Sequence, residues 1–143
     1  MTQDLNSLIA ALREELKQYG ELLNLLDQQE RAVQGPTPHL SFPATAALQR
    51  QAESILEARR VRECRRRALA RELRQHEEAT VLQLMPLLPP QFRPLLQSLV
   101  EENHALFLAV QRAANGNHDL LTRSAQSMAS LLHRLFPAET AAA

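Results

Sequence analysis

The chain has 143 residues, sixteen of them basic and sixteen acidic, so its formal net charge is zero and no overall field favours nucleic acid or an anionic membrane. Its first residues do not show the pattern that predicts a secretory signal, and no apolar run approaches the roughly 20 residues that cross a bilayer. Its one cysteine, Cys64, cannot form an internal disulfide. The chain has only three glycines and no tryptophan, and so few turn-forming and large aromatic residues are typical of packed helices. We expect a single cytoplasmic, all-α domain.

The first predicted helix covers residues 4–34. Asp4 can cap its start, and Gly35-Pro36 ends it. A helix of about 30 residues is roughly 45 Å long, so it needs a partner along its whole length. Its apolar residues recur at the three-then-four spacing of an amphipathic helix, and they are Leu5, Leu8, Leu12, Leu16, Tyr19, Leu23, Leu26 and Val33.

The second predicted helix covers residues 43–84 without a break, after a proline-containing loop. Ser41 can cap this helix, and its first turn tolerates Pro43. Its apolar face is thin and contains small residues, which indicates a close approach to a neighbouring helix. That face comprises Leu48, Ala52, Ile55, Ala58, Val61, Cys64, Ala68, Leu69 and Leu73.

The third predicted helix covers residues 91–136 and follows a proline-rich break at residues 84–90. Asn103 and Asn117 interrupt its apolar seam. Either they are buried and fix the register of packing, or they face solvent. A proline ends the helix, and residues 137–143 should form a disordered tail. The seam keeps a heptad spacing through Phe92, Leu96, Leu99, Asn103, Leu106, Val110, Ala113, Asn117, Leu120, Ser124, Ser127 and Leu131.

Eight arginines lie between Arg59 and Arg74. They could lie along nucleic-acid phosphates, but no aromatic residues are interleaved for base stacking. We favour a solvated face on which the arginines pair with glutamates at helical spacing, namely Glu53, Glu57, Glu63, Glu72 and Glu77. Residues 1–34 carry three basic and six acidic side chains, whereas residues 35–80 carry nine and six, so an antiparallel pair of the first two helices would be complementary in charge.

No pattern in the sequence supports catalysis or metal binding. Glu101 and His104 have the Glu-x-x-His spacing of di-metal helical bundles, but such sites need two copies of it. Zinc-finger spacings, nucleophile elbows and dinucleotide fingerprints are absent. We expect no enzymatic activity and no cofactor.

The three helices predict an antiparallel three-helix bundle with coiled-coil-like packing, in one domain over residues 1–136. The third helix is the longest, so its C-terminal apolar residues either overhang the bundle as a surface that pairs with another helix or pack back on it. These residues are Leu120, Leu121, Met128, Leu131, Leu132, Leu135 and Phe136.

Three patterns together suggest a family. The first helix reads Leu12-x-x-Glu15-x-x-x-Tyr19-x-x-Leu22-Leu23-x-x-Leu26-x-x-x-Glu30, and the second helix is rich in arginine. The third contains Asn115-x-Asn117-x-x-Leu120-Leu121 before an amphipathic end rich in serine and leucine. Over essentially its whole length the chain thus resembles the FlgN-type family of flagellar export chaperones.

The resemblance implies a cytoplasmic chaperone, monomeric or weakly dimeric, that binds hook-associated (hook–filament junction) proteins before type III export. It would pair its C-terminal amphipathic helix with the coiled-coil terminus of the cargo. Some relatives reach the export gate through a C-terminal tyrosine, whereas the one tyrosine here is Tyr19. An arginine-rich nucleic-acid binder and a structural coiled-coil adaptor are the rival hypotheses. By position, the partner-binding residues are Leu120, Leu121, Ser124, Met128, Leu131, Leu132, Leu135 and Phe136.

Overall fold

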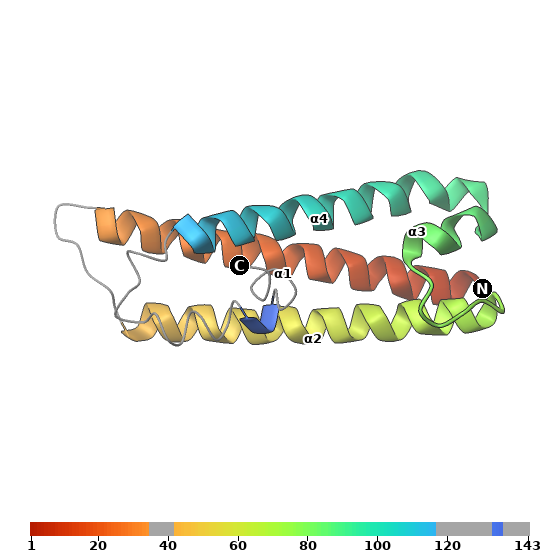
Figure 1. The fold of residues 1–143 in the computed structure, drawn as a ribbon, viewed down its shortest axis with the longest axis horizontal. Helices are drawn as coiled ribbons and strands as arrows, with labels where there is room; N and C mark the ends of the chain where they lie inside the picture. The colour runs from red at the N-terminus through yellow and green to blue at the C-terminus, as the bar shows by residue number, and fades with distance from the viewer. Residues whose placement is uncertain (35–41, 117–132, 136–143) are drawn as a thin grey trace.

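The computed structural model describes residues 1–34, 42–116 and 133–135, and every regular element there is helical. The long helices lie lengthwise beside one another (Figure 1) and are α1 (Thr2–Gln34), α2 (Phe42–Glu72) and α4 (Arg93–Gly116). Between α2 and α4 come the short helix α3 (Val81–Leu84) and the 3-10 turns η1 (Met85–Leu87) and η2 (Pro90–Phe92). The prediction of an all-helical chain with long, packed helices is confirmed.

Helix α1 is the central element of the structure. It packs extensively against both α2 and α4, and in Figure 1 it lies between them. The direction of α2 is opposite to that of α1, whereas α4 runs the same way as α1 (Figure 1). Because each outer helix packs mainly on α1, the side of α1 between α2 and α4 can remain open.

The core forms two clusters along α1. The first lies at the N-terminal half of α1 and gathers Leu5, Leu8, Ile9, Leu12, Leu69, Ala70, Val81, Leu84, Met85, Leu88, Leu96 and Leu99. The second surrounds the C-terminal half of α1 and gathers Tyr19, Leu22, Leu26, Leu48, Ala52, Ile55, Val110, Ala114 and Leu135. Most of these residues lie on the predicted apolar faces, so helical periodicity identified the core.

The N-terminus of α1 differs slightly from the prediction. The helix begins at Thr2, so Asp4 lies within the first turn and is not its cap. An acidic side chain there interacts favourably with the positive end of the helix dipole. The predicted end of the helix near residue 34 is confirmed.

The prediction that the second helix runs unbroken to residue 84 is wrong. Helix α2 ends at Glu72, and Arg74 adopts a left-handed conformation with φ of 56°. The Gln75 N–H donates to the Ala70 carbonyl at 2.8 Å, and the Arg74 N–H donates to that of Arg71 at 3.0 Å. These two bonds satisfy carbonyls at the helix end as a Schellman motif does, so the chain can turn without proline or glycine.

A separate cap then starts α3. The Thr80 side chain accepts a bond from the Gln83 N–H at 3.2 Å, and the Gln83 side chain accepts one from the Thr80 N–H at 2.9 Å. This reciprocal capping box satisfies two backbone donors that would otherwise lack partners. Residues 73–80 therefore form an ordered turn between α2 and α3, with hydrogen bonds at both ends.

The C-terminal part of the prediction is only partly covered. Helix α4 is described to Gly116, and residues 117–132 and 136–143 lie outside the described residues. A third helix unbroken to residue 136 is wrong, because at roughly 1.5 Å per residue it would carry Leu135 about 30 Å past Gly116, whereas Leu135 is buried in the cluster that contains Val110 and Ala114. The tail at 137–143 and the domain limits stay predictions. Of the two alternatives for the C-terminal apolar residues, an exposed overhang is wrong at Leu135. Its side chain packs back on the bundle and is 4% exposed within the second core cluster. No helix in the described ranges is long and apolar enough to cross a membrane.

Candidate functional site

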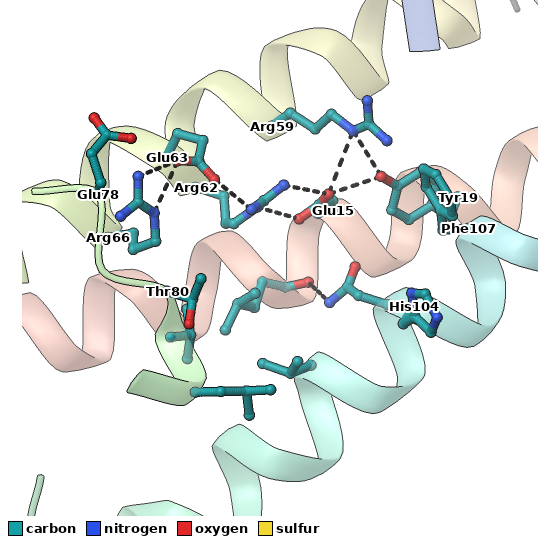
Figure 2. Close-up of a pocket in the computed structure, with 15 residues that line it drawn as sticks. Glu15, Tyr19, Arg59, Arg62, Glu63, Arg66, Glu78, Thr80, His104 and Phe107 are labelled. Carbon is teal, nitrogen blue, oxygen red and sulfur yellow. Dashed lines mark hydrogen bonds and ion pairs between the residues drawn. The ribbon is translucent and has the colours of Figure 1, made fainter. Parts of the chain in front are cut away.

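A cleft of about 670 Å³ opens between α2 and α4 beside α1 (Figure 2). One end is bordered by the segment that joins α2 to α3, and the other by aromatic rings of α1 and α4. Its lining mixes charged and apolar side chains, so it presents both ion pairs and apolar surface. The lining residues are Leu12, Glu15, Tyr19, Arg59, Arg62, Glu63, Arg66, Glu78, Thr80, Val81, Leu82, Val100, Asn103, His104 and Phe107.

Glu15 forms the centre of the polar network in this cleft. It is 3% exposed, and Arg62 donates to its two carboxylate oxygens, from Nε at 2.8 Å and from Nη2 at 3.2 Å. The Tyr19 hydroxyl donates a third bond at 2.9 Å. A buried carboxylate is tolerated only when it is paired and hydrogen-bonded, and Figure 2 shows these groups converging from α1 and α2.

Tyr19 links this network to Arg59. The Arg59 Nε donates to the Tyr19 hydroxyl oxygen at 2.9 Å, and its guanidinium carbon lies 5.8 Å from the Tyr19 ring centroid and 5.4 Å from that of Phe107. Burial and the nearby Glu15 carboxylate raise the pKa of Tyr19 to about 12, because both disfavour the phenolate. The phenol therefore stays protonated and remains a donor to Glu15.

The raised pKa of Tyr19 predicts a loss of stability at alkaline pH. The folded state binds the phenolic proton more tightly than the unfolded chain, whose pKa is near 10, so this stabilisation is complete below pH 10 and disappears as pH rises towards 12. The free energy of unfolding should fall by about 2 kcal/mol between pH 9 and pH 11.5. Urea unfolding followed by circular dichroism at pH 9 and pH 11.5 measures the decrease.

Tyr19→Phe is the control for the alkaline prediction. The variant loses the hydroxyl and its bond to Glu15, so it starts less stable at pH 9, but it has no phenol to titrate. Its free energy of unfolding should change little across the same window. A decrease as large as that of the unmodified chain would show that another group causes the alkaline effect.

Arg66 fixes the connecting segment to α2. It is 7% exposed, and its Nη1 donates to the carbonyls of Glu77 at 2.6 Å and Ala79 at 2.5 Å. Its Nε and Nη2 donate to Glu63 at 2.9 and 2.6 Å. Although burial alone would raise the pKa of Glu63, the hydrogen bond from Arg66 and the charge of Arg62 lower it. All three guanidinium nitrogens of Arg66 therefore donate hydrogen bonds, and they hold the connecting segment in place at one end of the cleft.

Asn103 is buried, which resolves the two interpretations of that seam position in favour of burial. Its Nδ2 donates to the carbonyls of Leu12 at 3.1 Å and Leu99 at 3.0 Å, so it connects α4 to α1. Its Oδ1 is buried without a hydrogen-bond partner. Asn117, the second seam position, lies outside the described residues.

Most of the arginines on α2 form ion pairs with glutamates. Arg60 pairs with Glu57 at the helical spacing that the solvated-face interpretation predicted. Arg71 pairs instead with Glu77, which lies beyond the end of α2. The Arg62 pair with Glu15 is the complementary contact predicted between the first two helices. The Arg62 pair is partly buried, whereas the pairs of Arg60 and Arg71 lie in solvent.

Other predictions for α2 are wrong. Glu53 pairs with Arg134 and not with an arginine of α2, and that hydrogen bond lowers the pKa of Glu53. Cys64 was placed on the apolar seam but is exposed, whereas Arg66, two positions further along α2, is buried. Within the described ranges, no three His, Cys, Asp or Glu side chains gather closely enough to hold a metal ion.

Of the eight predicted partner-binding residues, only Leu135 lies within the described residues. Its side chain is buried against α1, α2 and α4, and the Arg59 Nη1 donates to its carbonyl oxygen at 2.6 Å. The other seven fall outside and are Leu120, Leu121, Ser124, Met128, Leu131, Leu132 and Phe136. Sequence reasoning did not identify the cleft, although the motif Glu15-x-x-x-Tyr19 placed an acid on an otherwise apolar face.

A comparison with protein-family models matches residues 1–142 to the family described as FlgN protein. No curated protein and no solved structure gives a significant match. The family match covers α1, α2 and α4 together.

Proposed function

Because the chain belongs to the FlgN family of flagellar export chaperones, we propose that it holds hook-associated (hook–filament junction) proteins in the cytoplasm before type III export. The observation that carries this proposal is the family match over residues 1–142. On the arginine-rich helix, which suggested nucleic-acid binding, Arg60, Arg62, Arg66 and Arg71 pair with glutamates of the same chain. A protein-binding role is therefore the better supported of the two.

The proposed mechanism is a pairing of helices. A cargo terminus with an apolar face tends to self-associate, and pairing with the C-terminal amphipathic stripe of this chain would cover that face until release. The burial of Leu135 against three helices supports the idea that this stripe suits apolar helix surfaces. Ordering a disordered cargo segment lowers the net affinity, which favours release at the export apparatus. The stripe comprises Leu120, Leu121, Ser124, Met128, Leu131, Leu132, Leu135 and Phe136.

In this proposal the described helices form the scaffold of an antiparallel three-helix bundle, monomeric or weakly dimeric, with coiled-coil-like packing. The proposed binding segment follows the third helix in the chain. No catalytic step or cofactor is required, because holding and release are binding equilibria.

Deleting residues 118–143 tests the assignment of the binding segment. We expect the dissociation constant for a peptide from the coiled-coil terminus of a hook-associated protein to rise at least tenfold, because the apolar stripe is removed. Isothermal titration calorimetry measures this change, and circular dichroism shows whether α1, α2 and α4 remain helical. Undiminished binding by a folded, truncated chain would contradict the assignment.

A double substitution shows whether cargo binding needs the leucines of the stripe or only a chain of full length. Replacing Leu120 and Leu121 together with serine removes two leucines of the stripe. The matched control replaces Leu87 and Leu95 with serine, since both are exposed and neither lines the cleft. We expect weakened cargo binding in the first variant alone.

A further inference from the structure

We propose that Arg134 and Leu135 form a latch, which holds the C-terminal end of the proposed cargo-binding stripe on the bundle until cargo displaces it. The latch consists of the contacts that these two residues make with Glu53 and Arg59 of α2 and with the second core cluster. The inference rests on the proposed function, because it concerns how access to the same stripe is regulated.

The apolar part of the latch is the side chain of Leu135. It is 4% exposed and lies in the second core cluster, to which α1, α2 and α4 all contribute residues. Apolar surface that is removed from water in this way stabilises the latched state. The same side chain belongs to the stripe that is proposed to cover the apolar face of cargo, and it cannot be buried in both places at once. Cargo that uses Leu135 must therefore first free it from the cluster.

Two arginines fix the position of the latch. The Arg59 Nη1 donates to the Leu135 carbonyl oxygen at 2.6 Å, and a hydrogen bond from a charged donor is stronger than a neutral one. Arg134 donates to both carboxylate oxygens of Glu53, with 3.0 Å between Nη2 and Oε2. The short segment 133–135 accordingly lies beside α2 in Figure 1. A side-chain pair, a backbone carbonyl and a buried leucine together specify this docked position.

The contacts of the latch are few enough to be released. The side chains of Arg134 and Glu53 are 46% and 56% exposed, and exposed ion pairs contribute little to stability. The main contribution comes from one leucine, whereas a cargo helix would cover several leucines of the stripe. The apparent dissociation constant for cargo equals the intrinsic constant divided by the fraction of unlatched chains. The latch should therefore weaken cargo binding without preventing it.

A charge reversal at Glu53 tests the latch. Glu53→Arg places two arginines opposite each other, so the latched state loses an attraction and gains a repulsion. We expect the dissociation constant for a peptide from the coiled-coil terminus of a hook-associated protein to fall about three- to fivefold, as isothermal titration calorimetry measures. Glu57→Arg is the matched control, because it makes the same change of charge one turn further along α2, where Glu57 pairs with Arg60. It should leave the dissociation constant nearly unchanged.

A charge swap shows whether the effect depends on the pair itself. Glu53→Arg combined with Arg134→Glu restores the attraction, so the dissociation constant should return to that of the unmodified chain. Equal changes in the Glu53→Arg and Glu57→Arg variants, or no change in either, would overturn the proposal. A swapped chain that binds the peptide as tightly as Glu53→Arg alone would overturn it as well.

A covalent tether tests the docked position independently of the strength of the ion pair. In a Cys64→Ser background, the thiols of Glu53→Cys and Arg134→Cys are bridged with a short bismaleimide, and we expect a product within one chain at all protein concentrations. The control pair is Ser98→Cys with Arg134→Cys. Ser98 is exposed on α4 and lies about 18 Å along the helix before Val110 of the second cluster, so it should give little product. Failure of the first pair to form the bridge within one chain would overturn the proposal.

The tethered chain also distinguishes failure of the latch from failure of the proposed function. It should bind the cargo peptide about tenfold more weakly than the same double-cysteine chain whose thiols are capped singly with N-ethylmaleimide, because only the tethered chain is permanently latched. Equal binding by the tethered and capped chains would overturn the latch and leave the proposed cargo binding intact. Absence of binding by both chains, although the bridge forms, would contradict the proposed function and with it the regulatory role of the latch.

Discussion

Replacing Arg62 with alanine should lower the free energy of unfolding by about 3 kcal/mol, the low end of the cost of breaking a buried ion pair, because Arg59 Nε remains 3.9 Å from the carboxylate of the partner. The partner is Glu15, which is 3% exposed and loses both hydrogen bonds from Arg62. The Tyr19 hydroxyl at 2.9 Å and the more distant Arg59 Nε at 3.9 Å do not replace the two hydrogen bonds of a bidentate cation. Urea unfolding monitored by circular dichroism at neutral pH measures the loss.

Two further variants control the Arg62 experiment. Arg60→Ala removes an exposed arginine whose pair with Glu57 lies in solvent, and it should leave stability almost unchanged. Replacing both Arg62 and Glu15 with leucine removes the whole ion pair, and such replacements are often neutral, so the double variant should recover much of the stability. If Arg62→Ala cost no more than Arg60→Ala, the cleft network would not support the fold.

Leu8→Ala should lower the free energy of unfolding by about 2–5 kcal/mol, through lost burial and the cavity that remains. Leu8 is completely buried at the meeting point of α1 with the first core cluster. Close packing there leaves few ways for neighbouring leucines to relax into the space. The same urea titration gives the free energy, and its slope shows whether unfolding remains a single transition.

The matched control for Leu8 is Leu82→Ala, because Leu82 is 50% exposed on the short helix α3. A surface change of this kind usually alters stability by less than about 0.5 kcal/mol. Similar losses for both variants would mean that the first cluster is not the core that the burial pattern indicates.

The long helices could be predicted because their signals are local. Apolar spacing on α1 identified buried residues such as Leu8 and Leu26, and proline placed the breaks before α2 and α4. The end of α2 could not be found in this way, because its left-handed residue is Arg74 and not the usual glycine. The pair Thr80 and Gln83 had the spacing of a capping box and was the available signal for the break.

The cleft could not be predicted because it depends on how distant segments meet. Arg62 and Glu15 are separated by 47 positions, and Asn103 and Leu12 by 91. No local pattern gives the gap between α2 and α4 in which these groups lie. The one sequence signal was the carboxylate of Glu15 on an apolar face, which requires a buried partner from elsewhere.

The central position of α1 has a consequence for synthesis on the ribosome. Helix α2 follows α1 in the chain and can pack on it early, whereas contacts such as Asn103 with Leu12 span 91 positions and form only after α4 has emerged. Contacts between distant positions form slowly, and apolar surface exposed meanwhile promotes aggregation. The side of α1 that meets α4 therefore stays uncovered through most of translation, and nascent chains stalled before residue 93 should need protection by other cellular chaperones.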